Sequence, residues 1–196
     1  MNDRRLATLR LLSLVGALFT ALVIMAGAFT RLLDAGLGCP DWPGCYGALV
    51  VPDASSALLH SPDAPLEASK AWMEMIHRYL AGCLGVMVMA LLVLAWPRRR
   101  KPGFPWRLML MLFAALMVQG AFGAYTVTLK LWPQVVTLHL LGGLTVMTLF
   151  IWLHLRLRRV ARGEAALAAR PLGALMGVAT MLLVLQLALG GWTSSN

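Results

Sequence analysis

The chain has 196 residues, of which 60% are hydrophobic and 13% charged, and its mean hydropathy is +0.76. This composition excludes an ordinary water-soluble domain, because the apolar residues form uncharged runs long enough to cross a bilayer. The formal net charge of +9 raises the question of a nucleic-acid partner. However, the basic clusters are short, flank apolar runs and lack interleaved aromatic residues, so membrane topology and anionic lipid explain them better. We predict an integral membrane protein that binds no nucleic acid.

Five apolar runs can each span about 30 Å of hydrocarbon as a helix that rises about 1.5 Å per residue. In chain order they are Leu11–Thr30, Tyr79–Trp96, Leu108–Leu129, Leu131–Leu155 and Pro171–Asn196. The first run is too long for the apolar part of a signal peptide, and no small-residue cleavage site precedes Arg31. We predict an all-α integral membrane fold: an antiparallel four-helix transmembrane bundle plus a fifth transmembrane helix.

The basic residues predict how the chain is oriented. Most Lys and Arg residues lie before the first run, between the second and third, or between the fourth and fifth. The positive-inside rule places these segments and the N-terminus in the cytoplasm. The loop of residues 31–71 and the C-terminus are then external, and a bacterial inner membrane is the expected location.

A pattern of glycine, small residue, aromatic residue and threonine occurs near the outer ends of three runs, at Gly27–Thr30, Gly123–Thr126 and Gly190–Thr193. Small residues let helices or a flat ligand approach closely, and aromatic residues favour the membrane interface. The repeating unit is a helical hairpin with a histidine near the outer end of its second helix. We therefore predict that residues 1–160 form a first half of two hairpins. Residues 161–196 are then a linker and the first helix of an incomplete, truncated second half.

His77 and His139 have matched depths in the second and fourth apolar segments. Metal-binding or ionisable side chains are costly in a bilayer, so a matched pair favours a shared ligand. If the two helices face each other, the imidazoles can bind one haem iron from opposite sides. Hydrogen-bonded packing is the alternative. His154 has no counterpart at its depth, so we do not expect a second stacked haem.

Three charged residues near this pair are further candidates. Glu74 lies three residues before His77, on the same helix face, where its carboxylate can exchange protons or pair with Arg78 at i,i+4 spacing. Arg78 and Arg31 lie at the outer interface, where each can bind a haem carboxylate or extend to the lipid headgroups.

Cys39 and Cys45 enclose a short turn in the external loop. In an oxidising compartment they can form a disulfide ring worth roughly 2 kcal/mol by loop entropy. Redox exchange is the alternative, and the spacing does not fit a zinc site. Cys83 lies inside the second span and is interpreted as a packing thiol.

Taken together, the motifs resemble the haem A synthase family nearly end to end. They are Gly27–Arg31, Ala35–Cys45, Glu74–Arg78, Gln119–Thr126, Val136–His139 and Gln186–Thr193. The resemblance implies eight transmembrane helices in two halves, each with a histidine pair for haem. It also implies oxidation of a methyl group of haem O to the formyl group of haem A, for insertion into cytochrome oxidase.

By the same resemblance, His77 and His139 are similar to the first-half haem ligands, Glu74 to the essential acid, and Cys39 with Cys45 to the external cysteine pair. A haem b cofactor is implied in the missing second half, with haem O synthase or cytochrome oxidase assembly proteins as partners. We therefore expect a membrane oxidoreductase that modifies haem, although the activity of this chain alone stays open. Two alternatives also stay open: a b-type haem electron carrier, and a small transporter or assembly scaffold without haem.

Overall fold

The computed structural model describes residues 3–163 and 173–195, which are mainly helical. The long helices are α1 (Asp3–Leu32), α3 (Ala68–Ala95), α4 (Trp106–Thr128), α5 (Pro133–Arg162) and α6 (Gly173–Ser195). A short helix, α2 (Ala54–His60), lies in the loop between α1 and α3, and a single 3-10 turn, η1 (Trp96–Arg98), follows α3. The predicted all-α class is confirmed.

Within the described residues, α1, α3, α4 and α5 are long and apolar enough to cross a membrane. Many of their large apolar side chains point outward, as is expected where the surrounding solvent is lipid; Leu18 is 66% exposed and Val86 71%. In α6 the corresponding apolar stretch is Thr180–Thr193. Residues 164–172 lie outside the described residues. They include most of the predicted linker and the start of the predicted fifth span. The chain is an integral membrane protein.

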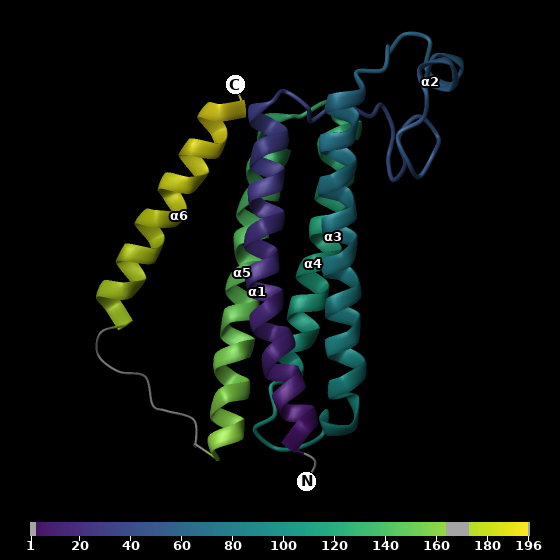
Figure 1. Ribbon diagram of the computed structural model, residues 1–196. Helices are drawn as coiled ribbons and strands as arrows, with labels where there is room; N and C mark the ends of the chain where they lie inside the picture. The colour runs from purple at the N-terminus through teal and green to yellow at the C-terminus, as the bar shows by residue number, and fades with distance from the viewer. Residues whose placement is uncertain (1–2, 164–172, 196) are drawn as a thin grey trace.

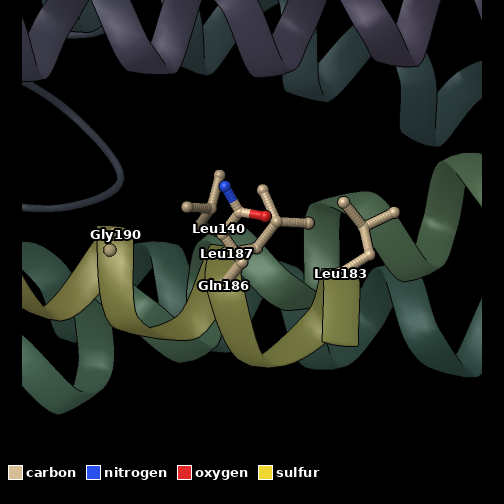
Figure 2. Close-up of a pocket in the computed structure, with 6 residues that line it drawn as sticks. Leu140, Leu183, Gln186, Leu187 and Gly190 are labelled. Atoms are coloured by element: carbon tan, nitrogen blue, oxygen red, sulfur yellow. The ribbon is translucent and has the colours of Figure 1, made fainter. Parts of the chain in front are cut away.

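The four long helices form an antiparallel bundle, with α6 beside it (Figure 1). In this bundle α1 packs against α3 and α5, and α4 packs against the same two helices, so α3 and α5 are diagonal to each other. We call the end that carries residues 33–67 the loop end, and the end where α1 begins the basic end. Helix α6 contacts α5, and an open, mainly apolar groove lies between them (Figure 2).

Helix α3 begins at Ala68, about three turns before the uncharged run that starts at Tyr79. The external loop expected at residues 31–71 ends close to this point, and Glu74 lies on the same helix as His77, as the sequence predicted. In the structure these two side chains pair with each other, so the helix continues through them. His77 therefore lies well inside α3.

The ends of α1 and α4 have the same backbone structure. The N–H of Ala35 donates to the carbonyl of Thr30, and the N–H of Leu131 donates to the carbonyl of Thr126, both at 2.8 Å. In each case the residue before the donor has a φ of 50°, in the left-handed region. The repeated sequence pattern thus gives the same helix end twice.

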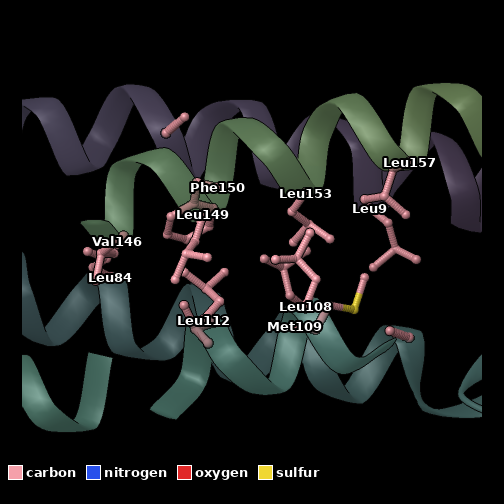
Figure 3. Close-up of a cluster of buried hydrophobic side chains, with 14 of the residues drawn as sticks. Leu9, Leu84, Leu108, Met109, Leu112, Val146, Leu149, Phe150, Leu153 and Leu157 are labelled. Atoms are coloured by element: carbon pink, nitrogen blue, oxygen red, sulfur yellow. The ribbon is translucent and has the colours of Figure 1, made fainter. Parts of the chain in front are cut away.

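The main hydrophobic cluster fills the part of the bundle toward the basic end (Figure 3). Its largest side chains come from all four helices and include Leu9, Leu91, Met109, Leu112, Phe150 and Leu153. A smaller cluster joins the loop to the start of α3 and ends at Met75.

The main cluster begins only at Leu84 on α3 and Val146 on α5, each about 10 Å along its helix from a histidine. We call the section between the two clusters, which contains His77 and His139, the histidine layer. The candidate site therefore lies where the buried apolar packing of the bundle is interrupted.

Candidate functional site

His77 on α3 and His139 on α5 lie opposite each other across the bundle. Their ring centroids are 6.5 Å apart, and the ring planes are nearly perpendicular, at 86°. A metal–imidazole bond is about 2.0 Å, and a ring centre lies about 1.2 Å behind its nitrogen, so two imidazoles on one metal have centroids about 6.4 Å apart. The structure thus brings the predicted pair to the separation that one iron requires, while iron ligation itself stays a prediction.

Both imidazoles contain an unsatisfied polar atom. The Nδ1 atoms of His77 and His139 are buried and have no hydrogen-bond partner among the described residues. The main-chain carbonyl of Val23, on α1, lies within hydrogen-bonding reach of the His77 ring. Because unpaired buried polar atoms are costly and rare, two of them at one site point to a bound group.

The first glycine of each of the first two repeats makes room for one histidine. A Cβ atom at Gly27 would lie 2.9 Å from Cε1 of His77, and a Cβ atom at Gly123 would lie 3.5 Å from Cε1 of His139. Each glycine therefore lies against the histidine of its own hairpin. The sequence predicted close approach at these positions, and the structure shows that an imidazole is what approaches.

Glu74 forms an ion pair with Arg78, which was one of the two roles considered from the spacing. The carboxylate accepts a hydrogen bond from Nη2 of Arg78 and another, of 2.9 Å, from the N–H of Cys39. The side chains are only 5% and 12% exposed, respectively. A buried ion pair is tolerable when further hydrogen bonds satisfy its atoms, as they do here.

The disulfide between Cys39 and Cys45 is present, and its ring is attached to α3. Nη1 of Arg78 donates to the carbonyls of Gly44 and, at 3.3 Å, Pro43, both inside the ring. The backbone also approaches α3 closely, because a Cβ atom at Gly38 would lie 2.5 Å from the main-chain carbon of Lys70. The disulfide ring therefore orients the polar pair on α3.

Arg31 is in the last turn of α1, four residues beyond Gly27 and so on the same helix face. It is partly buried at the loop end of the histidine layer. The structure thus places Arg31 and Arg78 at the same end of the site, on different helices. This is where anionic groups of a ligand held by the two histidines can be bound.

Within the described residues, no group of three or more His, Cys, Asp and Glu side chains could hold a metal ion. A site with only two protein ligands needs a ligand that supplies the other donors, and a porphyrin does so. His154 lies elsewhere, toward the basic end, with its Nδ1 3.0 Å from the Arg10 carbonyl and 3.3 Å from the Ser13 hydroxyl.

Sequence reasoning did not single out Gln119 as a site residue. Its side chain, on α4, fills the space beside Gly142 on α5, where a Cβ atom would lie 1.7 Å from its Nε2. The available signal was an amide inside an apolar span, one turn before Gly123. By contrast, the main-chain groups of Cys39 and Gly44 that bind the polar pair have no signal in the sequence.

Three proteins named haem A synthase are similar to this chain over almost all of its length. The protein of Shewanella oneidensis is 47% identical over 182 residues, which cover 91% of this chain and 54% of that protein. Those of Rhizorhabdus wittichii and Sphingopyxis alaskensis are 31% and 30% identical, covering 93% and 91% of this chain and 58% and 56% of their own lengths. The chain thus spans about half the length of the curated relatives it matches.

No solved structure matches the chain. A family model described as cytochrome oxidase assembly protein, COX15-CtaA, matches residues 10–196. This match includes α1 from Arg10 onward, the other three bundle helices, both histidines, the disulfide ring and α6. The chain belongs to the COX15-CtaA family of cytochrome oxidase assembly proteins.

Proposed function

We propose that this chain forms the substrate-binding half of a haem A synthase, which oxidises a methyl substituent of haem O to the formyl group of haem A for cytochrome oxidase assembly. The main support is the 6.5 Å separation of the His77 and His139 rings in the histidine layer. The similar proteins named haem A synthase support the same activity. They give no support to a b-type electron carrier.

In this proposal the two histidines hold the iron of haem O, and its carboxylates lie at the loop end. Arg31 and Arg78 bind these carboxylates by charge-assisted hydrogen bonds. Gly27 and Gly123 keep the helices close enough for both imidazoles to reach the same iron. When bound, the haem supplies the iron chemistry and the methyl group that is oxidised.

Glu74 is the proposed acid/base. Conversion of a methyl to a formyl group, with water as the oxygen source, releases four protons and four electrons; the electrons pass to an electron acceptor, and a carboxylate near the bound haem can accept the protons. Glu74 lies one turn from His77 on the same face of α3. Arg78 and the Cys39 N–H fix the direction of its two oxygens, and the loop end offers the shorter route for protons to leave the bundle.

The proposed orientation follows the basic residues: the basic end is cytoplasmic, and the loop end and the end of α6 are external, in a bacterial inner membrane. Residues 1–160 form the substrate-binding half, and residues 161–196 begin a second half. That second half would carry haem b. Haem O synthase and other cytochrome oxidase assembly proteins are the proposed partners for delivery of substrate and removal of product.

Replacement of Glu74 tests the enzymatic part of this proposal. In cells that make haem O, Glu74→Gln should lower the yield of haem A and its alcohol precursor about 100-fold and leave the absorption spectrum of bound haem unchanged. Extracted haems are separated by chromatography. Glu67→Gln is the matched control, because Glu67 forms an exposed pair with Lys70 at 3.1 Å. If Glu74→Gln leaves both the haem spectrum and the yield of product unchanged, the acid/base role is wrong and a haem carrier is favoured instead.

A further inference from the structure

Gln119 is a polar side chain near the middle of α4, inside a membrane-spanning segment. Among the described residues its amide has no recorded hydrogen-bond partner, and the side chain is partly exposed rather than fully buried. Polar groups in the bilayer interior are costly and usually have a functional partner. No such partner is recorded for this amide within residues 3–163 and 173–195.

The position of the amide is set by Gly142 on α5. A Cβ atom there would lie 1.7 Å from Nε2 and 2.7 Å from Cδ of Gln119, so only glycine allows the amide to occupy this place. Gly142 follows His139 by three residues, on the same face of α5 and about 4.5 Å nearer the basic end. The amide thus lies in the histidine layer, on the side away from Arg31 and Arg78.

We propose that Gln119 recognises the hydroxyl group that distinguishes haem O from haem B, an inference that rests on the proposed function. With the carboxylates of the ring at the loop end, the opposite edge of the ring faces the Gln119 amide. On that edge haem O has a hydroxyl group at the base of its isoprenoid tail, where haem B has a vinyl group. An amide both donates and accepts hydrogen bonds, so it suits a hydroxyl and gains nothing from a vinyl group. Gln119 is therefore a specificity-determining residue.

Two changes to this contact should have the same effect by different routes. Gln119→Met keeps an unbranched side chain of similar length, which can still fill the space beside Gly142, but it removes the amide. Gly142→Ala keeps the amide and displaces it, because the new Cβ would occupy its position. Each should weaken the binding of haem O about tenfold and leave the binding of haem B unchanged.

Gln186 on α6 provides a matched control. It lies four residues before Gly190, as Gln119 lies four residues before Gly123, but it lines the groove between α5 and α6 (Figure 2). Gln186→Met should therefore leave the binding of both haems unchanged.

The test is to titrate the purified protein with haem O and, separately, with haem B. The measured signal is the absorption of low-spin haem iron bound by two histidines. A selective loss of haem O affinity in Gln119→Met and Gly142→Ala, with Gln186→Met unchanged, supports the assignment. If both haems bind with that spectrum but Gln119→Met leaves their affinity ratio unchanged, the assignment is wrong and the proposed function stands. If neither haem binds to the wild-type protein in this way, the proposed function fails and the assignment with it.

Discussion

The hairpin α1–α3 and the hairpin α4–α5 bring equivalent histidines to one place, yet their surroundings differ. In the first hairpin, residues 33–67 connect the helices and include the disulfide ring, whereas four residues, 129–132, connect the helices of the second. The Glu74–Arg78 pair of the first has Val136 and Leu140 at the corresponding positions of the second. The histidine pair is thus symmetric, but the polar groups around it are not.

This difference separates two tasks. The repeated helix ends and glycines set the depth of both histidines, because each hairpin has the same local structure. Glu74, the proposed acid/base, and its partner Arg78 depend on the long loop of one hairpin, whose main-chain groups bind both side chains. Changes to the loop should therefore affect the polar pair, while changes to the repeats should affect the binding of haem.

The largest expected effect is that of the disulfide, which only the first hairpin has. The double replacement Cys39→Ser and Cys45→Ser should lower the free energy of unfolding by roughly 2 kcal/mol, because the open loop gains conformational entropy when the protein unfolds. Chemical denaturation in detergent measures this. Cys83→Ser is the control, since Cys83 is a free and exposed thiol; its interpretation as a packing thiol is therefore wrong. Equal stability of the double variant and the wild type would show that the loop does not depend on the disulfide.

A smaller effect compares the two repeat glycines directly. Gly27→Ala should lower haem affinity about tenfold, because the new Cβ, 2.9 Å from Cε1 of His77, forces the ring to move. Gly123→Ala should change it by no more than about twofold, since 3.5 Å is an ordinary contact distance. Haem titration of both variants tests the asymmetry. Equal losses would mean that the two hairpins hold their histidines equally tightly.

The smallest effect concerns His154, toward the basic end of α5. His154→Leu should leave the amount of bound haem unchanged and cost about 1 kcal/mol of stability, because it removes the contact with Ser13 and the Arg10 carbonyl. Haem content per chain and a denaturation curve test these two effects. A large loss of haem would show that His154 takes part in haem binding at the basic end. His154 would then not differ in role from His77 and His139.

Much of the fold can be predicted because it depends on long apolar runs and on register. The lengths of the runs predict α1, α4 and α5, and repetition of one hairpin predicts that His77 and His139 have similar depth. The disulfide could also be predicted as one alternative, from the spacing of Cys39 and Cys45 alone. These properties are local or periodic, so the sequence carries them directly.

Other parts depend on contacts between distant segments. The i,i+4 spacing predicts the pairing of Glu74 with Arg78, but the loop groups that complete it, on Cys39 and Gly44, appear only in three dimensions. Likewise, Gln119 and Gly142 are 23 residues apart, on different helices, and only packing brings them together. Partner groups on the main chain have no residue type to mark them, so no pattern predicts them.

The central claim is that one histidine from each hairpin binds the same haem iron. The most direct measurement is electron paramagnetic resonance of the purified protein reconstituted with haem O, together with the haem content per chain. We predict one haem per chain with the low-spin signal of two axial imidazoles, and loss of that signal in both His77→Ala and His139→Ala. Retention of the low-spin signal in either variant, or two haems per chain in the wild type, would contradict the claim.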